Sequence, residues 1–580
     1  MKPFGFYENP VLEEAMPQWR ARFVMLLLLL SFGALLIKAL YLQGLSTQFL
    51  QEQGVRRFER TMVLPPNRGK VFDRSGKVVL ASSVPVKAIW VIPEDANKAS
   101  PEQVQQLAQL LEMPAEEVRK RMQTPGRSFV YLRRQVDLEL AEQIADLGVP
   151  GVHQQDEMRR FYPEGESAAH VLGFTDIEDQ GLEGIELAFN DLLSGEPGSR
   201  RVMRDRLGRI VDDVREVIPP MHGEDLFLSI DAGVQYDAYS ALKKALDFHD
   251  AEAGSAVVLD VRTGEILALV NLPTYNPNDR NDRTGDALRN RVITDTFEPG
   301  SIMKPFTVAL ALESGAVDLD TQFDTGNGRY RYEGAVISDV SRNGVLDVAG
   351  IIRRSSNIGM TMISERMSSE QMWDGFDRLG FGHAPQLGFP GAASGRLRPW
   401  DSWRPIERAT MAYGYGMSSS LMQIAQAFTV FARDGDMVSL SLLRRDSQPT
   451  STRVFSPEIA QSMRSMLEAA AGPEGTRRAA VHGYRVAGKS GTARKIVDGA
   501  YSKSSYRSSF VGFAPVSDPQ IVVAVSVDEP RREGYFGGLV AAPVFSEVVA
   551  GSLRRLGVQP DAPVESLVAL DVNTGGVNND

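Results

Sequence analysis

The longest continuous apolar run in the chain covers residues 23–42, close to the N-terminus. About 20 apolar residues are enough for a helix to cross the hydrocarbon layer of a membrane. No small-x-small cleavage site follows promptly in residues 43–47, so the pattern favours an uncleaved anchor over a signal peptide. We therefore expect a polar tail at residues 1–22 and a transmembrane helix at residues 23–43. Arginines flank both ends of the run, so charge alone leaves the orientation open.

Residues 44–222 show a mixed pattern, in which short apolar runs alternate with charged segments. Helices are predicted at residues 101–111 and 114–122, because each begins with a proline that is followed by acidic residues. Segments rich in proline and glycine at residues 195–199 and 219–223 are typical of boundaries between parts of a chain. The pattern thus separates a first folded region from the rest of the chain.

A different pattern begins at Leu226 and extends to about residue 556. Its strand-like runs lie near both ends, at residues 227–230, 255–261, 266–272, 484–495, 508–515 and 521–527. Its helical patterns lie at residues 234–248, around residues 543–556, and onward from Ser301, Ile358, Glu370, Leu421 and Pro457. Because strands at both ends enclose helices, we expect an α/β fold whose sheet joins distant parts of the chain.

The composition is that of a globular chain with more than one domain. The chain has 580 residues, of which 43% are apolar and 24% are charged. Its net charge of −11 argues against nucleic acid as a partner, because phosphate binding needs a basic surface. The absence of cysteine excludes disulfides and thiol catalysis, and the six histidines lack metal-ligand spacing, so we expect no metal and no cofactor. Residues 557–580 contain acids but no lysine or arginine, which predicts a flexible tail.

The candidate chemistry begins with Ser301 and Lys304, which lie three residues apart after the turn signal at residues 299–300. Residues with this spacing share one face of a helix. A lysine that is buried loses its proton more easily, so it can activate a neighbouring serine as a nucleophile. The same spacing recurs at Ser240 and Lys243, in the middle of a predicted helix, where a solvent-exposed face explains it better.

Two later motifs complete a set. Ser355 and Asn357 form an S-x-N element before a predicted helix, and residues 489–492 form a K-[ST]-G element within a strand-like run. Together with S-x-x-K, these elements are shared by serine β-lactamases and penicillin-binding proteins. A second S-x-N, at Ser341 and Asn343, introduces no helix, so we choose the first. The ordered triple predicts serine acyl-enzyme chemistry.

With these motifs the chain resembles class B penicillin-binding proteins, the monofunctional D,D-transpeptidases of bacterial cell-wall synthesis. It is most similar to the division-specific (septal) type of Gram-negative bacteria, often called penicillin-binding protein 3. The resemblance rests on residues 68–76, 160–163, 184–186, 275–278, 289–291, 413–416 and 535–538. Glu298 before the nucleophile and Asn357 in the second motif favour the division type over the elongation type. Residues 496–504 and the C-terminal tail show the least family pattern.

The resemblance implies the fold and the topology. It implies a transpeptidase domain of serine β-lactamase-like fold at residues 223–556, with an antiparallel sheet flanked by helices. It implies an elongated α+β pedestal, of the dimerisation type, at residues 44–222. The tail at residues 1–22 would be cytoplasmic, the helix at residues 23–43 would span the inner membrane once, and the bulk of the chain would lie in the periplasm at the division septum.

The resemblance also gives each motif position a role. Ser301 would attack the penultimate D-Ala carbonyl of a stem peptide, with Lys304 as its base, and the N–H groups of Ser301 and Thr492 would form the oxyanion hole. Three further catalytic candidates follow. Ser355 would relay a proton, Asn357 would bind the peptide amide, and Lys489 would supply a positive field. The substrate-binding candidates are Ser490, Gly491, Thr492, Tyr506, Tyr535 and Phe536. For the three aromatic residues, ordinary core or surface packing is the competing interpretation.

The implied partners are peptidoglycan stem peptides, β-lactams as covalent inhibitors, and other membrane proteins of the divisome. Among these, a SEDS-type glycosyltransferase would pack on the anchor helix near Ser31 and Lys38. Three alternatives stay open: an elongation-type or specialised class B paralogue, a relative that senses or hydrolyses β-lactams, and a scaffold without activity. The region at residues 44–222 argues against a soluble β-lactamase, and the complete motifs argue against a scaffold.

Overall fold

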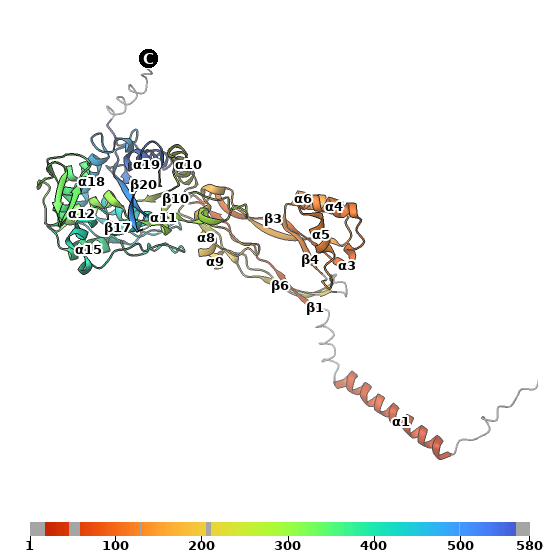
Figure 1. Cartoon of the computed structure of the whole chain (residues 1–580). Coiled ribbons are helices and arrows are strands. Elements are labelled where there is room, and N and C mark those ends of the chain that lie inside the picture. The colour runs from red at the N-terminus through yellow and green to blue at the C-terminus, as the bar shows by residue number, and fades with distance from the viewer. Residues whose placement is uncertain (1–17, 46–58, 128, 205–209, 498, 564–580) are drawn as a thin grey trace, which may run out of the picture. The chain divides into compact units, whose positions relative to one another are not determined.

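The computed structural model describes residues 18–45, 59–127, 129–204, 210–497 and 499–563 (Figure 1). The described chain divides into two compact units. Of the described residues, the first unit contains 18–45, 59–66, 196–204 and 210–221, and the second contains 67–127, 129–195, 222–497 and 499–563. The predicted boundary segments at residues 195–199 and 219–223 therefore lie at the two ends of residues 196–221, which belong to the N-terminal unit.

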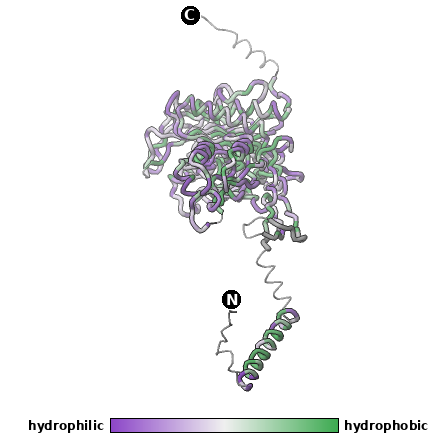
Figure 2. The backbone as a smooth tube through the Cα atoms, turned by 90° about the vertical axis from the view of Figure 1, so that its right-hand side faces the viewer, coloured by the Kyte–Doolittle hydropathy of each residue, from purple (hydrophilic) through white to green (hydrophobic). Residues whose placement is uncertain are grey.

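The N-terminal unit contains a long apolar helix and a small sheet. Helix α1 (Gln18–Leu40) continues into a π-helical turn, η2 (Tyr41–Leu45), and is long and apolar enough to cross a membrane. None of its residues is buried, and Figure 2 shows that it is hydrophobic over most of its length. The predicted apolar helix is confirmed, although it begins at Gln18. The antiparallel sheet contains, in order, β1 (Glu59–Leu64), β6 (Gly198–Arg204) and β7 (Ile210–Ile218).

The first part of the second unit, residues 67–195, is here called the pedestal region. It is built on the long strand β3, which pairs antiparallel with its neighbours. The strands are β2 (Val71–Phe72), β3 (Val79–Val91), β4 (Val130–Val136) and β5 (Val152–Phe161). The helices are α3 (Pro93–Ala96), α4 (Pro101–Leu110), α5 (Ala115–Met122), α6 (Leu138–Asp146), α7 (Ala169–Leu172), α8 (Gly184–Ala188) and α9 (Asn190–Ser194), with the 3₁₀ turn η3 (Gly165–Ser167). A capping box of Ser100 and Gln103 begins α4, and the two helices predicted in this region are confirmed.

A buried ion triad holds the pedestal region together. Glu186 on α8 accepts from Arg68 Nε at 2.7 Å and from Arg160 Nε at 2.6 Å. All three side chains are at most 1% exposed. A buried carboxylate between two guanidinium groups is stable only while all the partners are present, because each charge has lost its water.

The pedestal region packs firmly against the C-terminal region, residues 222–563. Ala169, Val171 and Leu172 of α7 belong to the same buried apolar cluster as the core of the C-terminal region. His170 on α7 contacts Ala287 O through Nε2 at 2.7 Å, and burial lowers the pKa of His170 to about 4. Asn278 accepts from the N–H of Tyr162 at 3.0 Å and donates to its carbonyl at 2.9 Å. The two regions therefore form one folded body.

A five-stranded antiparallel sheet forms the centre of the C-terminal region, in the order β10–β9–β21–β20–β19. The strands are β9 (Ala253–Asp260), β10 (Ile266–Leu272), β19 (Ala487–Val497), β20 (Ala500–Ala514) and β21 (Ile521–Asp528). The pairing of β21 with β9 places Val525 opposite Ala256 and joins the two ends of the region. The predicted sheet of distant segments is confirmed.

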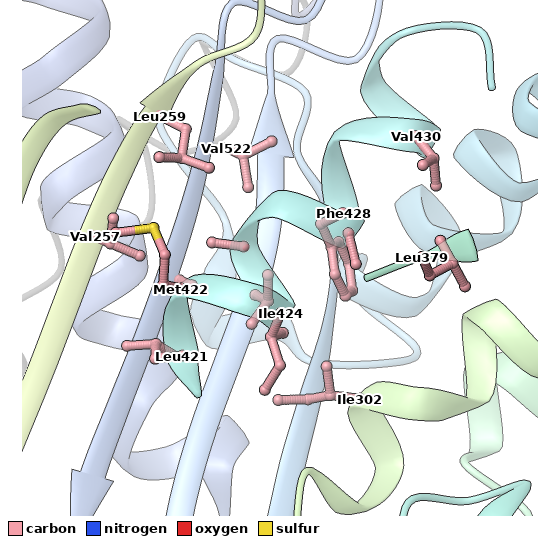
Figure 3. Packing of buried hydrophobic residues seen from close by; sticks show 14 of the residues in the cluster. Val257, Leu259, Ile302, Leu379, Leu421, Met422, Ile424, Phe428, Val430 and Val522 are labelled. Carbon is pink, nitrogen blue, oxygen red and sulfur yellow. The ribbon is translucent and has the colours of Figure 1, made fainter. Parts of the chain in front are cut away.

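Helices bury both faces of this sheet. Val258 belongs to the cluster that includes α10 (Ala232–His249) and α19 (Gly537–Arg555). The preceding residue, Val257, belongs to the cluster that includes α17 (Leu421–Ala432). Figure 3 shows this second cluster, in which Leu421, Met422 and Ile424 of α17 lie beside Val257, Leu259 and Val522 of the sheet. Burial on both faces explains why β9, β10 and β21 are mostly apolar along their whole length.

Shorter elements surround the sheet. The helices are α11 (Arg291–Thr294), α12 (Lys304–Glu313), α13 (Val348–Arg354), α14 (Asn357–Ser364), α15 (Ser369–Arg378), α16 (Pro405–Met411) and α18 (Pro457–Ala471). The 3₁₀ turns are η4 (Gly285–Leu288), η5 (Gly300–Met303), η6 (Trp400–Ser402) and η7 (Arg477–Ala479). The short strands are β8 (Leu226–Phe227), β11 (Thr296–Phe297), β12 (Gln322–Asp324), β13 (Arg329–Tyr332), β14 (Ala335–Ser338), β15 (Val345–Asp347), β16 (Ser419–Ser420), β17 (Asp436–Val438) and β18 (Ser451–Arg453).

Several boundaries differ from the sequence expectation. Ser301 lies in η5 and the α-helix begins only at Lys304, because Pro305 is tolerated only in the first turn of a helix. The predicted strand at residues 227–230 ends at Phe227. Strand β20 begins at Ala500 rather than at residue 508, since its polar, exposed half still pairs with β19. Helix α19 begins at Gly537 and contains Pro543 in its interior.

The first residues of the predicted C-terminal tail are held by hydrogen bonds. Asp561 accepts from the N–H of Arg485 at 2.7 Å and from the hydroxyl of Ser517 at 2.9 Å. The N–H of Ala562 donates to Gly483 O at 3.1 Å. Residues 561 and 562 of the predicted tail are therefore bound to the C-terminal region. The rest of the predicted C-terminal tail, residues 564–580, lies outside the described residues, as do residues 1–17 of the predicted N-terminal tail.

Candidate active site

Ser301 lies in the 3₁₀ turn η5, immediately before α12. The preceding residue, Gly300, has φ +58° and donates its N–H to Gly414 O at 3.1 Å. A Cβ on Gly414 would meet Gly300 O at 2.2 Å, so only glycine allows this approach. Ser301 is partly exposed, and its hydroxyl has no hydrogen-bond partner in the part of the chain that the structure describes. The turn thus presents an unengaged hydroxyl on a fixed backbone.

Lys304 begins α12 and is fully buried. Its ammonium donates to the carbonyl of Ser355 at 2.5 Å and to the hydroxyl of Ser355 at 3.1 Å. Burial, and then the nearby charge of Lys489, hold the pKa of Lys304 well below its usual range. A neutral lysine amine can accept a proton, so Lys304 has the electrostatic setting of a general base.

Lys489 lies on β19 and approaches the same serine from the other side. Its ammonium donates to Ser355 Oγ at 3.0 Å and to Ser490 O at 3.2 Å. Burial lowers the pKa of Lys489 to about 8. The hydroxyl of Ser355 therefore lies between two buried lysines, which gives protons a continuous path between them.

Ser355 and Asn357 lie at the junction of α13 and α14. Ser355 has φ +57° and ends α13, and Asn357 is the first residue of α14. The Asn357 amide donates to Ser338 O at 3.1 Å. The left-handed backbone of Ser355 turns the chain sharply between the two helices. The end of α13 therefore positions Ser355, and the start of α14 positions Asn357.

The third motif lies against the nucleophile's turn. A Cβ on Gly491 would come within 2.8 Å of Ile302 Cγ1, so the strand can pack on η5 only with glycine here. The hydroxyl of Thr492 accepts from the N–H of Gly537 at 2.9 Å. The hydroxyl of Ser490 accepts from Thr476 Oγ1 at 3.3 Å. These bonds orient two hydroxyls of β19.

The three candidate aromatic residues form one continuous stack. The rings of Tyr506 and Tyr535 are 4.0 Å apart and nearly parallel, and those of Tyr535 and Phe536 are 4.7 Å apart. Tyr535 and Phe536 are 37% and 44% exposed. The three rings therefore lie together in one stack, and their role in substrate binding stays a prediction beside ordinary surface packing.

The second S-x-x-K has a different setting. Ser240 and Lys243 are exposed on α10. Lys243 donates to the hydroxyl of Tyr239 at 3.1 Å, and this bond raises the pKa of Lys243. The solvent-exposed interpretation is confirmed, and a lysine whose pKa is raised stays protonated and cannot accept a proton from a serine.

The sequence comparisons agree with this geometry. Residues 254–550 match the penicillin binding protein transpeptidase domain, and residues 63–228 match the penicillin-binding protein dimerisation domain. The chain belongs to the class B penicillin-binding proteins. The predicted resemblance and fold class are thereby confirmed.

Relatives of this class B penicillin-binding protein match it over nearly its whole length. It is 42% identical over 549 residues to the probable peptidoglycan D,D-transpeptidase PenA of Neisseria gonorrhoeae, covering 94% of each chain. It is 39% identical over 551 residues to the peptidoglycan D,D-transpeptidase FtsI of Escherichia coli K12, covering 94% of this chain and 93% of the relative. The apo structure of the transpeptidase domain of Burkholderia pseudomallei penicillin-binding protein 3 is 52% identical, with a TM-score of 0.54, and covers 58% of this chain and 98% of that domain.

One residue of this penicillin-binding protein's site was missed from the sequence. The Asp339 carboxylate accepts from the N–H of Asn357 at 2.6 Å, from the N–H of Ile358 at 3.1 Å and from Ser356 Oγ at 2.6 Å. A carboxylate at a helix N-terminus satisfies unpaired donors and complements the helix dipole. Asp339 belongs to no motif and lies 18 residues from Asn357 in the chain, so only the fold reveals it.

Proposed function

We propose that the chain is a peptidoglycan D,D-transpeptidase that cross-links stem peptides through an acyl-enzyme on Ser301. The observation that carries the proposal is the placement of Ser355 Oγ within hydrogen-bond distance of both Lys304 and Lys489. One residue of each motif, Lys304, Ser355 and Lys489, therefore meets at Ser355 Oγ. Ser301 lies one turn before Lys304. A neutral buried lysine beside a serine is the arrangement that serine nucleophiles need when histidine is absent.

In the first half-reaction, Lys304 takes the proton of Ser301, and Ser301 Oγ bonds to the carbonyl carbon of the penultimate D-Ala. The N–H groups of Ser301 and Thr492 stabilise the oxyanion, each donor contributing about 10²–10³ in rate. The peptide bond to the terminal D-Ala breaks, and Ser355 passes a proton to the leaving amine. The ester that remains is the acyl-enzyme.

In the second half-reaction, the amine of a neighbouring stem peptide attacks the ester carbonyl. A new amide forms, the ester bond breaks, and Ser301 regains its proton. β-Lactams enter the first half-reaction as substrate mimics and leave a persistent ester, which makes them covalent inhibitors.

Substrate binding is assigned to the third motif and the aromatic stack. The positive field of Lys489 and the hydroxyls of Ser490 and Thr492 hold the terminal carboxylate through charge-assisted bonds. Gly491 permits the close approach of the strand, and Asn357 binds the peptide amide. The aromatic stack of Tyr506, Tyr535 and Phe536 forms the wall of the site against which the acyl-donor peptide lies.

The cellular setting follows from the same chemistry. Peptidoglycan lies outside the inner membrane, so we place residues 1–22 in the cytoplasm, the anchor in the membrane, and the pedestal (44–222) and transpeptidase (223–556) domains in the periplasm at the division septum. The anchor is proposed to pack on a SEDS-type glycosyltransferase of the divisome. Ser31 donates to Leu27 O within α1 at 2.8 Å, so its hydroxyl adds little polarity to that surface.

Labelling with a fluorescent penicillin tests the nucleophile. The wild-type chain is expected to form a covalent adduct that survives denaturation, and Ser301→Ala is expected to form none. Ser240→Ala, in the exposed copy of the motif, is the matched control and should label as the wild type does. Labelling that persists in Ser301→Ala refutes the assignment, and an adduct that hydrolyses within one labelling period indicates a β-lactamase instead.

A further inference from the structure

Glu298, three residues before Ser301, ties the nucleophile's segment to two other parts of the fold. Its Oε1 accepts from the N–H of Gly416 at 2.8 Å and from the hydroxyl of Tyr501 at 3.2 Å. Its Oε2 is buried without a hydrogen-bond partner among the described residues, and burial raises the pKa of Glu298. A buried polar atom that is left unpaired usually marks a constraint other than stability.

The bond to Gly416 continues a strand pairing that runs toward the nucleophile. Strand β11 pairs antiparallel with β16, so that Phe297 lies opposite Ser419. Further along, the N–H of Gly300 donates to Gly414 O at 3.1 Å. Pro299 has no N–H, so a regular ladder cannot pass through it. The Glu298 carboxylate replaces the missing backbone contact at this point.

The bond to Tyr501 brings the third motif into the same network. Tyr501 is the second residue of β20, in the hairpin whose other strand, β19, carries Lys489 and Thr492. The Tyr501 ring also meets the Tyr415 ring edge to face, with centroids 5.8 Å apart. One carboxylate oxygen therefore fixes the distance between the nucleophile's turn and the tip of this hairpin.

We propose that Glu298 is a positioning residue for acylation: it holds Ser301 in register through Gly416 and fixes the β19–β20 hairpin through Tyr501. It acts as a hydrogen-bond acceptor, and its charge is not required. The inference rests on the proposed role of Ser301. It predicts an effect on the rate of the acylation step and little effect on the noncovalent binding of the β-lactam.

The test measures acylation of the detergent-solubilised full chain by a fluorescent penicillin at a series of concentrations, which separates the maximal rate from the binding constant. Glu298→Ala should lower the maximal rate about 10- to 100-fold, because a small misplacement of reacting groups has an effect of this size. Its binding constant should change by less than about threefold. Tyr501→Phe keeps the ring and loses only the hydroxyl, so its rate should fall about threefold to tenfold.

Glu298→Gln keeps an oxygen that accepts both bonds and should restore the rate to within about threefold of the wild type. Tyr236→Phe, on the exposed face of α10, is the control for loss of a tyrosine hydroxyl and should match the wild type. Wild-type rates in Glu298→Ala and Tyr501→Phe overturn the inference, and so does a Glu298→Gln variant as slow as Glu298→Ala. If Glu298→Ala does not fold, Tyr501→Phe decides. Absence of labelling in the wild type refutes the proposed function itself, which keeps the two failures distinct.

Discussion

At the scale of single residues, the site is organised by two lysines that have lost their water. Lys304 and Lys489 both contact Ser355 Oγ, and burial is the main cause of the lowered pKa of each. The charge of Lys489 lowers the pKa of Lys304 further. Two adjacent buried ammonium groups repel each other, so the pair favours one neutral amine and one cation. The same burial thus suits Lys304 to its proposed role as base and Lys489 to its proposed role as electrostatic anchor.

This division of roles predicts a bell-shaped pH dependence of acylation. As the pH falls, Lys304 becomes protonated and can no longer accept the proton of Ser301, so the rate falls on the acid side. As the pH rises through about 8, Lys489 loses the charge that holds the substrate carboxylate, so the rate falls again. The second-order rate constant for a fluorescent penicillin, measured over a range of pH, checks this profile.

Lys489→Ala is the control for the alkaline limb. It should be slower at every pH, because the positive field is absent, and it should show no decrease near pH 8. A wild-type rate that continues to rise well above this pH contradicts the role given to Lys489.

At the scale of elements, the site depends on the packing of β19 on the 3₁₀ turn η5. Gly491 and Gly414 allow two close approaches to this turn, from β19 and from the segment before β16. The antiparallel pairing of β9 with β21 extends over the whole of β21, and the pairing of β21 with β20 and of β20 with β19 then places β19. Ser301, the proposed nucleophile, is therefore held by backbone contacts as well as by side chains.

Replacement of Gly491 tests this packing. Gly491→Ala places a Cβ 2.8 Å from Ile302 Cγ1, so β19 and η5 must separate. Overpacking of this kind costs about 1–3 kcal/mol and should also slow acylation, because the third motif moves away from Ser301. Thermal unfolding and the acylation rate measure the two effects.

Gly472→Ala provides the matched control. Its Cβ would lie 3.4 Å from the nearest atoms, an ordinary contact, so stability and acylation should stay close to the wild type. Equal behaviour of the two variants contradicts the packing argument.

The sequence predicted those parts of the site that local patterns specify. Strands such as β9 and β10 are apolar on both faces, and S-x-x-K carries its own spacing, so both were found without the fold. The contacts of Asp339 and Gly414 could not be predicted, because each meets its partner across more than ten residues of chain with no motif to mark it. Ser301 was placed in the α-helix because spacing alone does not distinguish a 3₁₀ turn from the first turn of a helix.

At the scale of the whole molecule, the pedestal and C-terminal regions act as one folded body. The sequence showed boundary segments near residues 195 and 222, which suggested separate domains. In the structure, α7 of the pedestal region enters the same apolar cluster as α12 and α17, and Asn278 binds the backbone of Tyr162. A change in the pedestal region can therefore alter the stability of the region that carries the site.

Glu186→Gln tests this coupling from a position far along the chain from Ser301. The amide removes the buried carboxylate that Arg68 and Arg160 both contact, so the free energy of unfolding should fall by about 3–5 kcal/mol. Because the two regions share a core, the capacity for penicillin labelling should be lost in the same transition as the fluorescence of Trp90 in the pedestal region, measured in a background where Trp19, Trp373, Trp400 and Trp403 are replaced by phenylalanine. Glu139, on the exposed side of α6, has no buried partner in the part of the chain that the structure describes, so Glu139→Gln should unfold with the wild type. Labelling that persists after the pedestal fluorescence has changed would show that the C-terminal region folds without its pedestal, and would contradict the single folded body.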